Sequence, residues 1–229
     1  NIMITAHHLV FGRKAIVKNE GLILDLPFQN SFIDATGKNT MIAGGASNLP
    51  TFTLEGGEYA ATFNGSQSLK TNANFVINSE IVSISFWIKT TQTTTGVLAE
   101  LSSNSDNTNA FYVALNNAIV NHLSLRDRIG SNYNFSTSPH NIGYWNHIVC
   151  IIDRSLPIAN ECSIYVNKIL SSTVSVKSGE VNGNFGLFPL FIGQRNGNSL
   201  GFNGRIKFLK IFKYPLSTTE ITNLYNKTM

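Results

Sequence analysis

The sequence predicts an all-β protein, an antiparallel two-sheet β-sandwich (jelly roll) with one short C-terminal helix. Its 229 residues suit one sandwich domain, since such domains commonly run to about 200–250 residues. Only 13% of the residues are charged while 42% are hydrophobic. Asn, Ser, Thr and Gly supply most of the polarity, as strands joined by tight turns require. Short segments with strand signals also recur at regular spacing.

The segments with strand signals are separated by turn residues along the whole chain. They lie at 21–27, 59–63, 68–71, 82–90, 96–102, 110–115, 122–126, 145–153, 161–167, 169–176, 190–194 and 204–213. Asn64-Gly65 and Asn203-Gly204 are turn dipeptides because both residue types tolerate positive φ. No repeat with a period of about 20–50 residues recurs in the sequence, which excludes a solenoid or a propeller.

A short helix follows the last strand segment. Ser217 is a helix-capping residue, and Glu220 three residues later completes a capping box. Leu216 precedes the cap and can pack against Ile221 as a hydrophobic staple. These signals predict that a helix begins directly after Ser217.

Residues 1–20 precede the domain, which we place at 21–229. The segment contains Ile2, Ile4, Leu9, Val10, Phe11, Ile16 and Val17, large apolar side chains that cannot cheaply remain in water. We therefore expect an N-terminal arm or extra strand that packs on the domain or docks it to a neighbouring subunit, giving a homo-oligomer or a larger assembly. No apolar run approaches the ~18 residues of a membrane-spanning helix, so no membrane insertion is expected. Residues 2–6 lack the basic start of a signal peptide, so no leader indicates the compartment.

The two cysteines lie on neighbouring strand segments. If 149–152 and 162–166 form a hairpin that turns near Leu156-Pro157, Cys150 and Cys162 face each other on the core side. Two readings stay open: two buried free thiols, or a cross-strand disulfide where the backbone geometry permits it.

The net charge of +4 and the isoelectric point near 9.1 raise the question of nucleic-acid binding. The cations concentrate in one late strand at Arg205, Lys207, Lys210 and Lys213. In a regular strand Lys207 and Lys210 face opposite ways, so they form no single basic face. We interpret them as solvated edge-strand charges that block aggregation, and we expect no nucleic-acid partner.

Several phrases of the sequence resemble laminin G-like, concanavalin A-like lectin/glucanase jelly-roll domains. They occur in the family's order over 21–226, and they are Asp34-Ala35-Thr36-Gly37-Lys38-Asn39, Ala61-Thr62-Phe63-Asn64-Gly65-Ser66, Ile84-Ser85-Phe86-Trp87-Ile88-Lys89, Trp145-Asn146-His147-Ile148-Val149, Tyr165-Val166-Asn167 and the C-terminal strand and helix. Lys168 stands where the family has a glycine after the fifth phrase. The resemblance implies the same sandwich, which carries binding, adhesion, structural and occasionally hydrolytic roles.

The resemblance also implies a structural calcium site. Its ligands would be the loop aspartate, here Asp34, and an acidic residue at the position that Lys207 occupies. A lysine there removes an oxygen ligand and adds repulsion, so we expect the site to be lost and the protein to hold no cofactor. An Asp34–Lys207 ion pair is the alternative to the metal.

Acidic residues do not form the pattern that glycoside hydrolysis needs. Sandwich glycosidases carry alternating carboxylates on one strand, because retaining hydrolysis places an acid and a nucleophile about 5 Å apart. Glu55 and Glu58 are the nearest pair, and we place them in a loop around Gly56-Gly57. The sequence therefore predicts that the chain is not an enzyme.

Aromatic residues on polar strand faces are the candidate ligand-binding residues. Trp87 alternates with apolar residues and lies opposite the most apolar face of its strand. Trp145, His147 and Tyr165 share the more polar face of their hairpin. Flat rings beside hydroxyls and amides suit sugar recognition. The alternative is that these rings fill a core beneath covering loops.

The sequence thus predicts a non-catalytic recognition or adhesion module that is extracytoplasmic and binds a cell-surface glycan or a protein partner. One alternative is a structural component, such as a decoration, fibre or spike, of a virion or surface assembly, docked through residues 1–20. Another is a glycan-active enzyme. The localisation that follows is extracellular, at a cell surface or on a virion.

Overall fold

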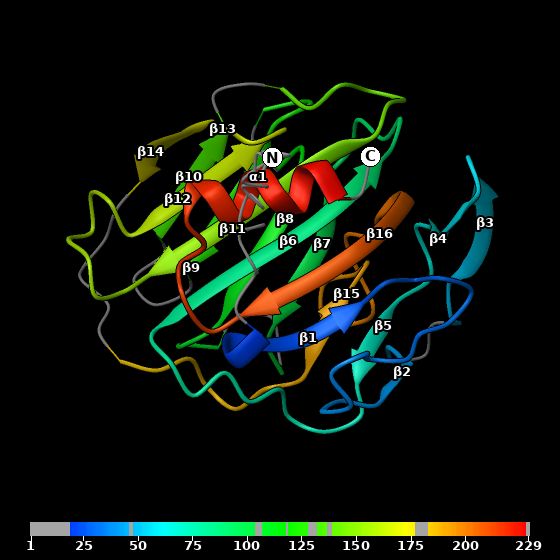
Figure 1. Ribbon diagram of the computed structural model, residues 1–229, viewed down its shortest axis with the longest axis horizontal. Helices are drawn as coiled ribbons and strands as arrows, with labels where there is room; N and C mark the ends of the chain where they lie inside the picture. The colour runs from blue at the N-terminus through cyan, green and yellow to red at the C-terminus, as the bar shows by residue number, and fades with distance from the viewer. Residues whose placement is uncertain are drawn as a thin grey trace, which may run out of the picture.

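The computed structural model describes residues 19–45, 48–103, 107–117, 119–127, 132–136, 139–176 and 183–227. Two antiparallel sheets pack face to face, and one helix lies on the outer face of the first sheet (Figure 1). The predicted all-β sandwich with a short C-terminal helix is confirmed. The predicted arm at residues 1–20 lies almost wholly outside the described residues, which begin with a short 3-10 turn, Asn19–Gly21.

The first sheet has eight strands. In spatial order it comprises β13 (Ile169–Leu170), β12 (Cys162–Val166), β11 (Asn146–Asp153), β6 (Ile81–Lys89), β16 (Asn203–Phe212), β4 (Glu58–Asn64) and β3 (Thr51–Glu55), with β1 (Leu22–Leu26) also paired with β16.

The second sheet also has eight strands. In spatial order these are β14 (Ser172–Val176), β10 (Asn132–Ser136), β9 (Leu123–Asp127), β8 (Phe111–Leu115), β7 (Gly96–Leu101), β15 (Leu190–Ile192), β5 (Leu69–Thr71) and β2 (Met41–Ala43). The strands that the sequence analysis missed are β2, β3 and β10. The short β2 and the Asn/Ser-rich β10 carry few β-forming residues, and their pairing with neighbouring strands outweighs that weak local preference.

The main core fills the space between the two sheets. The largest fully buried side chains include Phe28, Phe63, Phe86, Phe111 and Phe202. They come from strands and loops far apart in the sequence, so burying their apolar surface holds the two layers together.

A second apolar cluster joins the helix α1 (Thr218–Lys227) to the outer face of the first sheet, over β11 and β6 (Figure 1). Ile221 and Leu224 of α1 pack on Val149 and Phe212 of the sheet. The expected capping box is present, because the Glu220 backbone N–H donates to Ser217 Oγ at 3.3 Å and the Ser217 N–H donates to Glu220 Oε2 at 2.9 Å.

The two cysteines are buried and free, on the core face as predicted, but they do not face each other. Cys150 is opposite Ile164, and Cys162 is opposite Ile152. A Cys150–Cys162 pair requires a hairpin centred on Leu156, whereas the observed pairs are centred on Pro157, which shifts the register by two residues.

The expected placement of the late cations is wrong. Strand β16 is central, since it pairs with β1, β4 and β6, so its lysines are not edge-strand charges. A register shift between Lys207 and Lys210, where Phe208 has φ of 53°, adds a residue to this strand. Lys207 and Lys210 therefore both reach carboxylates, those of Glu58 and Asp25.

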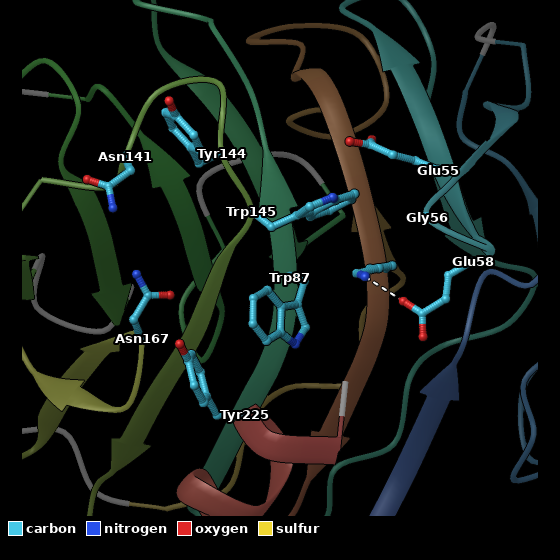
Figure 2. A pocket seen from close by; sticks show the side chains of 10 residues that line it. Glu55, Gly56, Glu58, Trp87, Asn141, Tyr144, Trp145, Asn167 and Tyr225 are labelled. Atoms are coloured by element: carbon cyan, nitrogen blue, oxygen red, sulfur yellow. Dashed lines mark hydrogen bonds and ion pairs between the residues drawn. The ribbon is translucent and has the colours of Figure 1, made fainter. Parts of the chain in front are cut away.

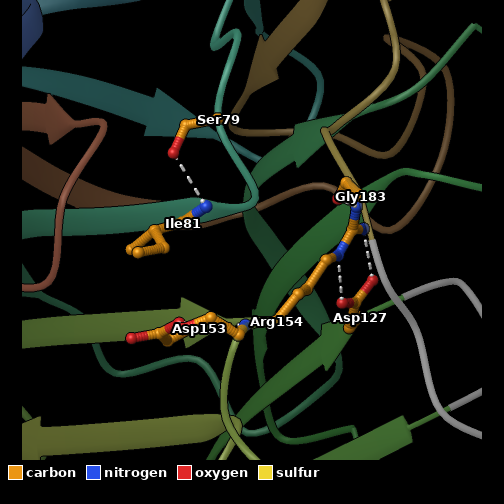
Figure 3. A network of polar contacts seen from close by, with 7 residues as sticks. Ser79, Ile81, Asp127, Asp153, Arg154 and Gly183 are labelled. Atoms are coloured by element: carbon orange, nitrogen blue, oxygen red, sulfur yellow. Dashed lines mark hydrogen bonds and ion pairs between the residues drawn. The ribbon is translucent and has the colours of Figure 1, made fainter.

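A buried ion pair ties the two sheets together at one end (Figure 3). Arg154, directly after β11, donates from Nε and Nη2 to the Asp127 carboxylate at the end of β9, both at 2.7 Å. A third bond, from Arg154 Nη1 to the Gly183 carbonyl, spans 3.0 Å. The guanidinium also lies 3.8 Å from the ring centroid of Phe185.

Candidate functional site

A hollow of about 690 Å³ opens on the outer face of the first sheet, and we call it the outer hollow (Figure 2). Its lining combines aromatic rings, amides, carboxylates and one lysine. The residues are Glu55, Gly56, Glu58, Trp87, Asn141, Tyr144, Trp145, Asn167, Lys207 and Tyr225.

One wall is the tip of the β3–β4 hairpin. Gly56 and Gly57 have φ of 63° and 85°, the conformation that a two-residue turn between twisted strands requires. Glu55 and Glu58 are therefore a cross-strand pair on one face, and the expectation of a loop at these residues is wrong. In the sequence, the Gly56-Gly57 dipeptide between two segments of alternating apolar and polar residues indicates this hairpin.

The opposite wall is the loop that leads into β11. Asn146 is fully buried and holds this loop by accepting from the Asn141 N–H at 3.0 Å and donating to the carbonyls of Asn141 and Tyr144, both at 2.9 Å. The loop in turn presents Tyr144, which is 71% exposed, and the half-buried Trp145. Because its backbone is held by a buried amide, this wall is preorganised.

The floor is a stack of aromatic rings. Trp87 of β6 is only 5% exposed, and its ring lies on Tyr225 of α1, with centroids 5.4 Å apart and planes inclined by 26°. Lys207 crosses this floor, with its Nζ 4.8 Å from the Trp145 ring centroid and 5.8 Å from that of Trp87. The same ammonium binds Glu58 at 2.6 Å, so its charge is balanced.

His147 lies beneath the floor and does not line the outer hollow. Its ring centroid is 5.3 Å from that of Trp87, and its Nε2 is 2.9 Å from Ser85 Oγ. The residue is 1% exposed, and this burial lowers the pKa of the imidazole to about 4. His147 is thus neutral near pH 7 and supports the ring stack from below.

Tyr165 is also absent from the outer hollow. Its half-buried ring packs on the cluster that joins α1 to the sheet. The structure therefore brings together Trp87 and Trp145 of the four predicted ligand-binding residues. Trp87, His147 and Tyr165 are mainly packing residues, whereas Trp145 lines an open wall.

Eight lining residues were not predicted as ligand-binding residues from the sequence: Glu55, Gly56, Glu58, Asn141, Tyr144, Asn167, Lys207 and Tyr225. The adjacent pair Tyr144-Trp145, in a loop, was a usable signal for two exposed rings. No local sequence signal indicated Tyr225, because its position depends on where α1 docks on the sheet.

Both carboxylates of the outer hollow are held by cations. Glu55 accepts from Lys89 and from Arg205, and Glu58 accepts from Lys207. The bond from Lys89 lowers the pKa of Glu55 against the opposing effect of burial, and Arg205 lowers it further. A carboxylate held ionised in this way is a poor general acid.

Asp34 lies in a separate loop, and the predicted Asp34–Lys207 ion pair is wrong. Its carboxylate accepts from the backbone N–H groups of Asp25, Thr36 and Asn39 and from the Thr36 and Asn39 side chains. Although burial raises the pKa of Asp34, these hydrogen bonds lower it below its ordinary value. Within the part of the chain that the structure describes, no three His, Cys, Asp or Glu residues gather as a metal site. In the same residues, no helix has the length and apolarity needed to cross a bilayer.

Solved structures share this sandwich. Domain 4 of AbnA, a GH43 extracellular arabinanase from Geobacillus stearothermophilus in complex with arabinotriose, matches with a TM-score of 0.67 and 18% identity, over 90% of this chain and 98% of that chain. A botulinum neurotoxin type C structure, described with cell entry that depends on two ganglioside molecules, matches with a TM-score of 0.63 and 17% identity, over 91% of this chain and 51% of that chain. The binding domain of botulinum neurotoxin DC in complex with rat synaptotagmin II matches with a TM-score of 0.64 and 18% identity, over 91% of this chain and 52% of that chain.

This chain thus spans about half of each of these neurotoxin chains. At these identities the likeness establishes the fold. No curated protein matches the chain in sequence. The family model of the concanavalin A-like lectin/glucanases superfamily matches residues 62–222. Since this match covers well over half of the chain and agrees with the observed sandwich, the chain belongs to the concanavalin A-like lectin/glucanases superfamily.

Proposed function

We propose that the chain is a non-catalytic carbohydrate-recognition module that binds a glycan in the outer hollow. One observation carries the proposal: Tyr144 and Trp145 stand on a loop whose backbone the buried Asn146 amide holds, and both rings remain accessible. Aromatic rings of this kind stack on the CH faces of sugars. The Asn141 amide in the same hollow offers a donor and an acceptor to sugar hydroxyls. The Asn167 amide is part of the wall, because it accepts from the His147 N–H at 2.9 Å and donates to Asn146 Oδ1 at 3.3 Å.

The structural neighbours support this proposal by analogy. One of them is in complex with arabinotriose, and another belongs to a toxin whose cell entry depends on gangliosides. A third is in complex with a protein, so a protein partner is the second ligand class that we consider. Such ligands are found at cell surfaces, and we place the chain outside the cytoplasm on this ground.

The absence of catalysis is part of the proposal. Glu55 and Glu58 are each paired with lysine or arginine, which removes the protonated acid that glycoside hydrolysis needs. We expect no cleavage of any polysaccharide that the chain binds. Release of sugar products that Glu58→Gln abolishes would overturn this part.

The test of binding is a glycan array followed by calorimetry with the strongest hit. Tyr144→Ala and Trp145→Ala should each weaken binding by about 1–3 kcal/mol, the cost of truncating a ring that carries binding energy. Leu187→Ala removes a large side chain, 60% exposed, from another loop and is the matched control. Unchanged affinity in both ring variants would contradict the proposed site.

Assembly through residues 1–20, as in a decoration, fibre or spike of a virion or surface structure, stays a prediction. Light scattering of the chain with and without these residues tests it. A monomer in both forms would argue against this role and leave carbohydrate recognition unaffected.

A further inference from the structure

A second recess of about 330 Å³ adjoins the outer hollow, and we call it the basic recess. Its lining includes Lys89, Thr90, Thr91, Gly143, Asn203 and Arg205. Gly143 directly precedes Tyr144 and Trp145 of the outer hollow, and consecutive Cα atoms are about 3.8 Å apart. The two depressions therefore share one rim, and a chain of two or three sugars can reach both.

The basic recess carries an excess of positive charge. Lys89 and Arg205 both pair with Glu55, so two cations share one carboxylate. Lys207 does not alter this balance, because it pairs with Glu58. One net positive charge is left beside the aromatic hollow.

Both cations are accessible to a ligand. The side chains of Lys89 and Arg205 are 29% and 33% exposed. Within the described part of the chain, the Arg205 guanidinium donates to Glu55 through Nη1, which leaves Nε and Nη2 for another acceptor. A guanidinium and an ammonium side by side suit a carboxylate or a sulfate group.

We propose that the ligand is an acidic saccharide, whose carboxylate or sulfate group binds Lys89 and Arg205 in the basic recess while a sugar ring stacks on Trp145 or Tyr144. This inference rests on the proposed function and adds the chemical class of the ligand. Glu55 competes with the acid group for the same two cations and so limits the affinity.

The experiment compares acidic saccharides with neutral counterparts of the same length. The probes are sialyllactose against lactose, hexagalacturonate against its methyl ester, and sulfated against unsulfated dextran oligomers. The carboxylate and sulfate pairs distinguish the two sources of the acid group. We expect at least one acidic probe to bind about tenfold more tightly than its neutral counterpart. This preference should shrink at 1 M salt, where the screening length falls to about 3 Å.

Charge variants assign that preference to the basic recess. Lys89→Gln and Arg205→Gln should each lower the ratio of acidic to neutral affinity, a ratio that a general loss of binding would not change. Lys213→Gln removes an exposed lysine beyond the far end of β16 and is the matched control. Glu55→Gln should strengthen acidic binding several-fold, because it removes the competing carboxylate. A gain of affinity cannot result from partial unfolding, so this variant keeps the test decisive if Arg205→Gln folds poorly.

Three results would overturn the inference. If neutral probes bind as tightly as acidic ones, the basic recess plays no part while carbohydrate recognition stands. If hexaglutamate binds as tightly as the best acidic saccharide, the cations select charge alone, as for an acidic peptide. If wild-type protein binds none of these saccharides, the inference fails, and the proposed function fails with it only if the glycan array is also blank.

Discussion

His147 and Asp34 are polar side chains that the fold buries, and each is used for structure. His147 is neutral because it is packed between Trp87, Ser85 and Tyr225, where a charge would be poorly solvated. Asp34 keeps its charge because five hydrogen bonds replace its water. The same burial thus has opposite consequences, depending on the partners that surround each group.

Acid should destabilise the protein through His147. The folded-state pKa of about 4 lies below the unfolded value of 6.5, so the unfolded chain gains a proton first as the pH falls. Stability is full above pH 6.5 and is lost between there and about pH 4, with a loss near pH 5 of about 2 kcal/mol from this group. Urea unfolding of the wild type and of His147→Gln between pH 7 and 5 measures this pH-dependent loss of stability. His122→Gln is the control, and identical pH dependence in wild type and His147→Gln would rule the effect out.

Asp34 should organise its loop without a metal. Since its oxygens already accept five hydrogen bonds, we expect a chelator to leave the melting temperature within about 1 °C. Asp34→Ala should destabilise the fold by about 3 kcal/mol or more, because it leaves several buried N–H donors without an acceptor. Asp34→Asn keeps one oxygen and should cost less. A fall of several degrees with chelator, reversed by calcium, would show that the loop does hold the ion.

Helix α1 determines what the outer face of the first sheet can do. Its apolar residues cover Val149 and Phe212. The segment before the helix supplies hydrogen-bond partners to the Ser83 hydroxyl, which donates to the Tyr214 carbonyl at 2.7 Å and accepts from the Leu216 N–H at 3.1 Å. Tyr225 extends this cover to Trp87 and His147. The helix thereby turns most of a polar strand face into a core and leaves the hollow open beyond its last turn.

The capping box should contribute measurably to that docking. Ser217→Ala removes the hydroxyl that accepts the Glu220 N–H, and we expect a loss of about 1 kcal/mol in the free energy of unfolding. Thr218→Ala changes an exposed residue of the first turn and should cost little. Denaturant titration of the two variants tests this. Equal stabilities would mean that packing alone holds the helix.

At the scale of the whole molecule, the two sheets are joined by more than apolar packing. Arg154 belongs to the first sheet's side and Asp127 to the second, and both side chains are fully buried (Figure 3). The bond from Arg154 to Gly183 adds the segment that leads toward β15. One arginine therefore connects three parts of the chain that are distant in sequence.

Breaking this pair on one side should destabilise the whole sandwich. Arg154→Met leaves the Asp127 charge buried without its cation, which should cost about 3–5 kcal/mol. The double variant Arg154→Met with Asp127→Leu should recover part of that loss, because no charge is left buried. Lys210→Met, in a more exposed pair, should cost less. Equal stability of the single and double variants in denaturant would contradict this account.

Local sequence patterns predicted most of the fold. Strand signals between turn residues predicted the segments that became β4, β6, β11 and β16. The Ser217 signals predicted the helix start, because residues near in sequence determine both kinds of element. The resemblance to laminin G-like domains over 21–226 predicted that these strands form a two-sheet sandwich. The same local reasoning correctly placed Cys150 on a core face, yet it missed the strand register, which depends on where the turn is centred.

The sequence by itself determined the all-β sandwich, its C-terminal helix and the superfamily. Only the tertiary structure decided which aromatic rings remain accessible. Trp87 and Trp145 look alike in sequence, but α1 covers the first while the loop held by Asn146 exposes the second. Likewise, only the tertiary structure brings Glu55 into a hydrogen bond with Arg205, which lies 150 residues later in the chain. Such contacts depend on how distant elements dock, and no local pattern of residues encodes that arrangement.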